Sequence, residues 1–599
     1  MVSPGPPPAP LRRSYLSRMM LVLVIAAAVL ADSTSFIRVN QIGYLPEASK
    51  VAIACSLDSA RIATFVVRNT HGRVVFGPRQ ARAAAAFGPC FTTHRLDFTA
   101  LRTAGRYTIV AGGRTSREFR IGADVYGGGA DTALYYMRQQ RSGWNPLFQD
   151  SVHKYDGNVV DDSGRVVKFQ PVNGGWADAS DYLQYVTTSA TATYMMLAAY
   201  RDHPRAFADA FDAKGVAGAN GVPDVLDEAR HGLEWLLRMF PSDTEMYNQL
   251  ADDRDHSYFD LITNDSSDYG WGKGRERAVY PCTGRPQGLF QYKNRSNGYA
   301  STAGKYTAAF ALGSAIFARD SALSALFRRK AIAAYALGRQ YPGVCQTAPG
   351  RAPYFYEEDN WADDMELGAA ELYALTRDSA FRTQGMKYAR MEPVTSWMGA
   401  DTARHYQWFP WHNNGHFSLW RNAPAPERTM LASYYRRGLD AVVRRATNGF
   451  RVGIPFIWCS NNLMISFASQ AMLYRRMTGD TRFRESEQAA IDWLFGVNPW
   501  GVSMVIGYPN DGSWARDPHS AHASKLGVHV LLGGLLDGPV YRSIYQNLRG
   551  IHLAQPDEFA PFNTGFIVYH DDIGDYSTNE PIMDGTASLV YLLSGLANR

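Results

Sequence analysis

Two carboxylates stand three residues apart in a glycine-rich stretch of the chain. Residues 173–181 read Asn-Gly-Gly-Trp-Ala-Asp-Ala-Ser-Asp and lead into a helical pattern that we expect to span Asp181–Tyr200. We therefore place Asp178 and Asp181 at a helix entrance, where free N–H groups and the helix dipole favour the ionised form. An ionised carboxylate is what the activation of a water molecule requires. On spacing alone, a simple helix cap is an equally good interpretation.

A second acidic group precedes the last helical pattern, which we expect over Met583–Ala597. Its members are Asp571, Asp572, Asp575 and Glu580. Pro581 keeps Glu580 extended and suits a first helical position, so the carboxyl group is presented from a loop at a helix mouth. Neighbouring carboxylates raise a carboxyl pKa, and a general acid must stay protonated near neutral pH. Glu580 is therefore a candidate general acid, with an exposed acidic turn as the alternative.

The elements that must position these groups form two regions. Residues 32–123 contain short β-type runs separated by turn residues, which predict an immunoglobulin-like antiparallel sandwich. These runs are Phe36–Val39, Lys50–Ala54, Thr64–Arg68, Arg73–Phe76 and Arg106–Val110. Over residues 124–599 the apolar spacing is helical as far as the C-terminus.

Long loops rich in Gly, Asn, Asp and Trp join the predicted helices, of which we count about a dozen. Such loops favour a toroid of helical hairpins with a loop-lined cleft over a bundle, which uses short connections. The main predicted helices are Thr132–Gln140, Asp181–Tyr200, Asp224–Met239, Tyr299–Phe317, Ser321–Gln340, Ala362–Thr376, Glu427–Arg445, Asn461–Met477, Arg482–Phe495 and Met583–Ala597.

The N-terminal residues 1–31 read as a signal peptide. Arginines precede the apolar run Leu21–Leu30, and small residues offer a cleavage site near Ala31. The run is short for a membrane span, although an uncleaved anchor is the alternative. We expect a secreted or periplasmic product without stable membrane association. Nucleic acid is not an expected partner, because 61 basic and 56 acidic residues are mixed without a long basic run.

Five cysteines are too few and too scattered to predict a disulfide framework or a zinc ribbon. Cys55 and Cys90 lie within the small β-region and are the one pair for which we consider a bond. An odd total leaves at least one thiol, and no cysteine chemistry is predicted.

Several motifs resemble glycoside hydrolase family 9, in the order that this family has them, and they extend over nearly the whole mature chain. Residues 36–46, Phe-Ile-Arg-Val-Asn-Gln-Ile-Gly-Tyr-Leu-Pro, look like the opening of the immunoglobulin-like domain that precedes many of its catalytic domains. The catalytic-domain motifs are 174–181, Asn-Pro-Trp-Gly-Val-Ser at 498–503, Asp-Pro-His at 517–519, Gly-Leu-Leu-Asp-Gly-Pro at 534–539, and Asp575-Tyr576 through Asn579-Glu580 with Ala587 beyond.

The resemblance implies an (α/α)6 barrel with an open cleft and the inverting hydrolysis of β-1,4-glucans. Motif by motif, Asp181 corresponds to the base that activates water and Asp178 to the carboxylate that helps hold that water. Glu580 corresponds to the acid that protonates the leaving oxygen. An inverting site keeps its acid and base roughly 6.5–9.5 Å apart so that a water molecule fits.

His519, Trp176 and Tyr576 are the residues that we expect to contact the sugar, since each belongs to a matching motif. The family commonly continues as Pro-His-His-Arg at this point, whereas this chain reads Pro518 to His522 as Pro-His-Ser-Ala-His. The missing arginine leaves room for a trimmed oligosaccharide, xyloglucan or an amino-sugar substrate, and for exo-action. Further candidate stacking platforms are Trp271, Trp361, Trp411 and Trp458.

A structural calcium ion is the one cofactor considered, and none is required for the chemistry. Residues 220–224, Asn-Gly-Val-Pro-Asp, with Asp227 and Glu228, resemble an oxygen-rich turn that supports a hard cation in several relatives. Together with Asp224 these residues are equally well interpreted as an acidic cap on the following helix.

Two other classes of protein compete with a hydrolase. A non-catalytic glycan-binding protein would keep the toroid and its aromatic residues, but it would have no need of both Asp181 and Glu580. A polysaccharide lyase would need a basic cleft with Tyr or His as its base, and the paired acidic motifs argue against it.

Overall fold

The computed structural model describes residues 34–257 and 259–597. The expected signal peptide at residues 1–31 lies outside the described residues. No helix of the described part is long and apolar enough to cross a lipid bilayer.

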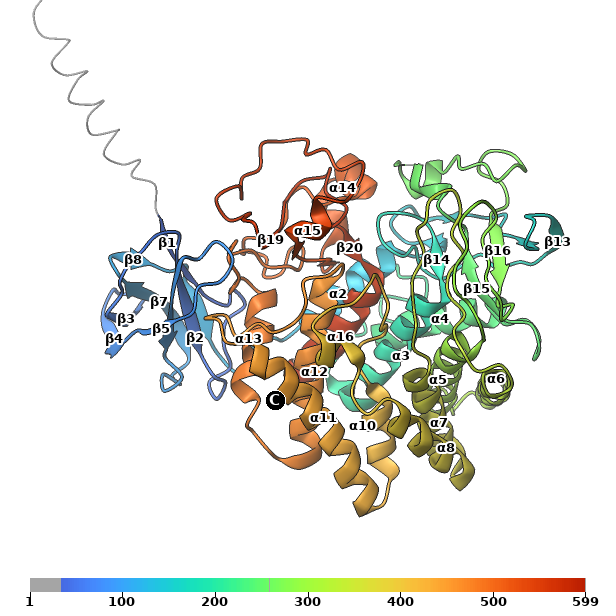
Figure 1. Ribbon diagram of the computed structural model, residues 1–599, viewed down its shortest axis with the longest axis horizontal. Helices are drawn as coiled ribbons and strands as arrows, with labels where there is room; N and C mark the ends of the chain where they lie inside the picture. The colour runs from blue at the N-terminus through green and yellow to red at the C-terminus, as the bar shows by residue number, and fades with distance from the viewer. Residues whose placement is uncertain (1–33, 258, 598–599) are drawn as a thin grey trace, which may run out of the picture.

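The N-terminal domain is a sandwich of two antiparallel sheets (Figure 1). One sheet has the order β1-β2-β6-β5 and the other β4-β3-β7-β8, with β9 also paired to β7. The strands are β1 Ser35–Arg38, β2 Val51–Ser56, β3 Thr64–Asn69, β4 Val74–Gln80, β5 Arg82–Ala84, β6 Thr92–Asp97, β7 Gly105–Ala111, β8 Arg114–Thr115 and β9 Phe119–Ile121. Alternating side chains from both sheets, such as Phe65, Leu96 and Ile109, fill the core between them.

The second domain is a double ring of helices. Six inner helices contact one another in a closed cycle, α3-α5-α7-α10-α12-α16. They are α3 Val186–Asp202, α5 Ala300–Ile316, α7 Ala362–Thr376, α10 Asn414–Asn422, α12 Ser460–Thr478 and α16 Met583–Ala597. Helices such as α5 and α16 are apolar or small on nearly every side and almost wholly buried, as expected of an inner ring.

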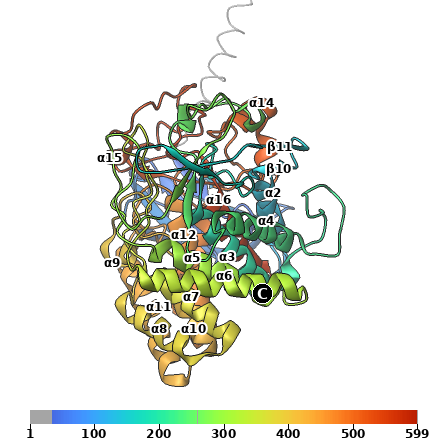
Figure 2. The ribbon, with the colours of Figure 1, turned by 90° about the vertical axis from the view of Figure 1, so that its right-hand side faces the viewer.

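Each inner helix is backed by an outer one that contacts it. The outer helices are α2 Gly129–Gln139, α4 Asp224–Met239, α6 Ser321–Gln340, α8 Ser379–Met391, α11 Ala425–Arg445 and α13 Arg484–Leu494. Short helices α9 Ser396–Ala400, α14 Ala521–Leu526 and α15 Arg542–Tyr545 lie in the connections. The long loops gather at one end of the ring, above the helices in Figures 1 and 2.

These loops carry a second β-structure, which corrects the expectation of purely helical structure after residue 124. A five-stranded sheet has the order β13-β12-β16-β15-β14. Its strands are β12 Asn158–Val160, β13 Val166–Phe169, β14 Gln184–Tyr185, β15 Tyr247–Leu250 and β16 Ala278–Pro281. Smaller pairs join β10 Gly143–Asn145 to β11 Asp150–Val152, β17 Leu535–Leu536 to β20 Pro581–Ile582, and β18 Val540–Tyr541 to β19 Ile567–Val568.

The two domains share a polar contact whose centre is buried. The amide of Asn40 donates to Asp492 Oδ1 at 2.8 Å, and both residues are buried. The backbone N–H of Gln41 donates to Phe495 O at 2.9 Å, and its side chain donates to Gly501 O at 2.8 Å. The change from strands to helices occurs between β9 and α2, and the boundary at residue 123 stays a prediction.

Two disulfides correct the expectation of no cysteine chemistry. Cys55 and Cys90 form the pair that was considered. Cys282 and Cys345 form a second bond, 63 residues apart in sequence, which their spacing does not reveal because β16 and the segment before α7 meet only in the folded chain. Cys459 is free and buried.

Candidate active site

A pocket of about 330 Å³ lies among the loops at the open end of the helical ring. Its acidic lining residues are Asp178, Asp181, Asp537 and Glu580. Its aromatic and imidazole lining residues are Phe259, Tyr354, Tyr356, Tyr406, Trp458, Tyr576, His256, His405 and His519. The three residues expected to carry the chemistry therefore meet in one cavity, which also holds aromatic faces suited to a sugar ring.

Asp178 and Asp181 lie in a loop, which corrects their expected place at a helix entrance. Helix α3 begins at Val186, after the short strand β14. The loop is closed by its own hydrogen bonds: Asp178 N donates to Leu183 O at 2.9 Å, and Leu183 N donates to Asp181 Oδ1 at 3.1 Å. One Asp181 oxygen thus holds the turn while the residue faces the pocket.

Asp178 is a buried residue in the wall of the pocket. Thr188 Oγ1 donates to its Oδ1 at 2.6 Å, and the Tyr356 hydroxyl donates to its Oδ2. Burial raises the pKa of Asp178 well above its ordinary range, and the charges of Asp181 and Asp584 raise it further. The electrostatics therefore oppose the ionised form that a helix entrance would have favoured.

Glu580 lies in a loop, as expected, but the loop leads into the short strand β20 at Pro581, and α16 begins only at Met583. Ser180 N donates to Glu580 Oε1 at 3.0 Å, and the Ser180 hydroxyl donates to the same oxygen. This contact joins residues 400 positions apart and brings the candidate acid against the loop of the candidate base. Burial raises the pKa of Glu580, and the charge of Asp181 raises it further. The charge of His519 and the hydrogen bonds from Ser180 lower it, but the net shift of the pKa is upward.

His256 is a site residue that sequence reasoning missed. Its Nε2 lies 3.3 Å from Asp181 Oδ2, and the side chain is about one-third exposed, at 32%. Burial lowers the pKa of His256, but the hydrogen bond and charge of Asp181 outweigh it and raise the pKa to about 9. No local pattern in the sequence points to this side chain, because only the fold brings it to Asp181.

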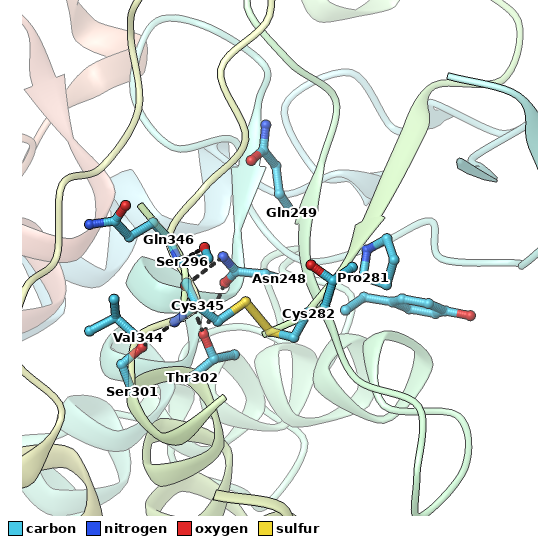
Figure 3. Close-up of a disulfide and its surroundings, with 12 residues drawn as sticks. Asn248, Gln249, Pro281, Cys282, Ser296, Ser301, Thr302, Val344, Cys345 and Gln346 are labelled. Atoms are coloured by element: carbon cyan, nitrogen blue, oxygen red, sulfur yellow. Dashed lines mark hydrogen bonds between the residues drawn. A yellow bond between two sulfur atoms is a disulfide. The ribbon is translucent and has the colours of Figure 1, made fainter. Parts of the chain in front are cut away.

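The segment that carries Tyr354 and Tyr356 is anchored by the second disulfide (Figure 3). Cys345 O accepts hydrogen bonds from Asn248 Nδ2 at 2.9 Å and Thr302 Oγ1 at 3.3 Å, drawn as dashed lines in Figure 3. The disulfide therefore fixes the start of the loop whose Tyr356 contacts Asp178.

Family profiles match both domains. The profile of glycosyl hydrolase family 9 covers residues 126–593, and that of the cellulase N-terminal ig-like domain covers residues 32–116. The chain belongs to glycosyl hydrolase family 9. The resemblance of the sequence motifs is thereby confirmed.

Individual relatives agree with this family 9 assignment. Endoglucanase C of Cellulomonas fimi is 28% identical over 95% of the chain, which spans only 52% of that relative. A xyloglucan-specific endo-beta-1,4-glucanase of Bacteroides ovatus is 24% identical over 94% of this chain and 93% of its own length. A solved structure of a metagenome-derived family 9 endoglucanase aligns with a TM-score of 0.72 at 27% identity, covering 94% and 99% of the two chains. The chain is a glycoside hydrolase of the cellulase type, and the expected (α/α)6 barrel is confirmed.

Two of the three expected sugar contacts line the pocket of this family 9 enzyme. His519 and Tyr576 do so, together with Trp458 from the wider set of aromatic candidates. Trp176 does not: it is fully buried, and its indole N–H donates to Glu228 Oε1 at 2.7 Å. Trp176 therefore packs in the protein core. An indole next to two glycines is as compatible with the protein interior as with a sugar ring, so the motif does not distinguish the two.

The three residues considered for calcium are already neutralised or bonded. Asp224 pairs with Arg138 at 3.0 Å, and Glu228 pairs with Arg141 at 2.8 Å, all four side chains being buried. Asp227 accepts a hydrogen bond from a neighbouring asparagine at 2.8 Å. Within the described residues there is no group of three His, Cys, Asp or Glu side chains that could hold a metal ion. The arrangement does not fit a calcium ion at these residues, because arginines already pair with Asp224 and Glu228.

His522 does not supply a cation in place of the missing family arginine. His522, which follows in the sequence, is buried between Phe148 and Tyr182. Burial lowers its pKa to about 4, so it is neutral near pH 7. It does not line the pocket.

Proposed function

We propose that this family 9 enzyme hydrolyses β-1,4-glucosidic bonds by a single displacement, with Asp181 as base and Glu580 as acid. Asp178 helps to hold the attacking water. The observation that supports the proposal is the Ser180–Glu580 contact, because it brings the acid to the loop of the base across one pocket. Two carboxyl groups with different surroundings in one pocket are what acid and base catalysis at the same bond requires.

The two carboxyl groups are distinguished by their neighbours. His256 supplies a positive charge beside Asp181, the residue that we assign as the base. Burial and Asp181 favour the protonated form of Glu580, which an acid needs. After the water attacks, Asp181 holds the proton that it removed, and Glu580 has given its proton to the leaving oxygen.

The anomer of the first product tests this mechanism. A single displacement at a β-linkage releases an α-anomer, which proton NMR detects before mutarotation. The measurement uses the full chain with cellotetraose, and the β-anomer is the outcome that would exclude the inverting scheme. A viscosity assay on a soluble β-glucan then tests the proposed endo-action, since internal cleavage lowers viscosity before many reducing ends appear.

We further propose that the enzyme is secreted or periplasmic. Two disulfides support this, because such bonds persist in oxidising compartments. Expression of the full gene product followed by N-terminal sequencing of the exported protein tests it, and a mature chain that starts near Asp32 is the expected result. A protein retained in the cytoplasm with the first 31 residues intact would contradict the proposal.

A further inference from the structure

The pocket is lined by more carboxyl groups than the proposed hydrolysis requires. Four carboxyl groups line it, and no Lys or Arg is among its lining residues. Of its three histidines, His256 is paired with Asp181 at 3.3 Å, and the charge of His519 acts on Glu580. Burial lowers the pKa of His405 to about 3, so His405 brings no positive charge.

Asp537 is the carboxyl group without a role in the proposed reaction. It is 2% exposed, and its backbone is fixed by hydrogen bonds from Asp537 N to Glu580 O at 2.9 Å and from Asn461 N to Asp537 O at 3.0 Å. Cys459 Sγ donates to Oδ1 at 3.3 Å. The other oxygen, Oδ2, accepts no hydrogen bond from the described residues, although Asp537 lines the pocket.

An ionised carboxylate is energetically unfavourable at a buried position where one oxygen accepts no hydrogen bond and no cation pairs with it. Burial, followed by the charge of Glu580, raises the pKa of Asp537 well above its ordinary range. A ligand that brings its own positive charge removes this cost, because the carboxylate then ionises against an ammonium group. A sugar hydroxyl offers only a hydrogen bond between neutral groups, which is roughly half as strong.

We propose that Asp537 binds the ammonium group of an amino sugar, so that the enzyme prefers β-1,4-linked glucosamine units with free amines to glucose units. The inference rests on the proposed function, since it assigns the substrate of the same site. An N-acetylated unit has no charge to offer and a larger substituent, and it is disfavoured for both reasons.

Three tetrasaccharides of equal linkage test the proposal: cellotetraose, fully deacetylated chitotetraose and fully N-acetylated chitotetraose. For the full chain we expect kcat/KM on the deacetylated substrate to exceed that on cellotetraose by about tenfold or more, the effect of one charged contact. Equal or better cleavage of cellotetraose would overturn this inference alone. Failure to cleave any of the three would overturn the proposed function as well.

The variant Asp537→Asn tests the residue. It removes the charge and keeps the size, so we expect the ratio of the two kcat/KM values to fall about tenfold. Asp260→Asn is the matched control, because Asp260 is ion-paired with Lys525 and does not line the pocket. A ratio that stays the same in Asp537→Asn, or falls equally in both variants, would contradict the role of Asp537.

Inhibition of the unmodified enzyme gives a test that does not depend on folding of a variant. Glucosamine should inhibit with a constant about tenfold lower than that of glucose, because only the amine can pair with Asp537. Equal inhibition constants for the two monosaccharides would overturn the proposal.

Discussion

His256 Nε2 lies 3.3 Å from Asp181 Oδ2 and gives the candidate base a positively charged neighbour. Its pKa is raised to about 9, above the ordinary value of 6.5, so the histidine is charged throughout the neutral range.

The first prediction concerns His256→Gln, which keeps a polar side chain without the charge. We expect kcat/KM to fall by roughly tenfold, since a hydrogen bond to a charged group contributes about 1.5 kcal/mol.

The same pair predicts a pH dependence of stability. A group whose pKa is higher in the folded chain contributes its full stability below its unfolded pKa of about 6.5, and this contribution is lost as the pH rises through about 9. The difference in Tm between the unmodified enzyme and His256→Gln should therefore shrink from pH 6 to pH 10. Because the side chain is one-third exposed, water screens the pair and the difference is small. A constant difference across this range would show that the pair does not titrate as described.

The second prediction assigns the acid. Glu580→Gln keeps the shape but cannot donate a proton, so hydrolysis of natural glucans should fall by about 10²–10⁴-fold. Aryl glucosides with good leaving groups need little acid help and should lose much less. Glu234→Gln, on the exposed side of α4, is the matched control. An equal loss on both substrate types would count against Glu580 as the acid.

The third prediction separates the two aspartates. Asp181→Ala should be nearly inactive, because the water loses its base. Asp178→Asn should retain more activity, since its amide oxygen can still accept from one of the hydroxyls of Thr188 and Tyr356. Steady-state kinetics of both variants on cellotetraose, with circular dichroism to confirm folding, provide the measurement. The reverse order of activities would exchange the two roles.

The fourth prediction concerns the arginine pairs at the start of α4. Glu228→Gln leaves the buried Arg141 guanidinium without its carboxylate, so we expect a loss of about 3–5 kcal/mol in the free energy of unfolding. Chelation of divalent cations should leave Tm unchanged in the unmodified enzyme, because arginines neutralise this turn. A fall in Tm on chelation that added calcium reverses would show a calcium site in the chain after all.

The fifth prediction concerns the disulfide between Cys282 and Cys345. Replacing both with serine should lower the free energy of unfolding by about 2–5 kcal/mol and reduce kcat, because the loop that carries Tyr356 loses its anchor. The matched control is the double serine variant of Cys55 and Cys90, which should lose stability without a comparable loss of kcat. Equal kcat in both variants would show that the Tyr356 loop does not depend on the bond.

The parts of the fold with strong local periodicity were predictable. Helices α4, α6 and α7 have the bounds that the apolar spacing predicts, Asp224–Met239, Ser321–Gln340 and Ala362–Thr376. The sheet in the loop region was not, because its strands are only two to four residues long and, apart from the local pair of β12 with β13, they pair segments that are far apart in sequence. Local patterns carry no information about such pairing.

The candidate site, like the fold, was predictable only in part. The motifs identified Asp178, Asp181 and Glu580, and the structure brings them into one pocket. His256 and Asp537 were missed as site residues, because their roles depend on contacts with Asp181 and Glu580 across the fold. Trp176 was misassigned, since residue type alone does not distinguish a core tryptophan from a sugar platform.

The buried contact of Asn40 with Asp492 has a consequence for the evolution of this two-domain architecture. Replacing either residue alone removes one buried hydrogen bond of the other, whose bonded atom keeps only its second partner: Gln488 for Asp492 and the Tyr126 hydroxyl for Asn40. Positions 40 and 492 should therefore covary among relatives that keep both domains. A chimera that takes its N-terminal domain from another parent would need to inherit both positions from that parent.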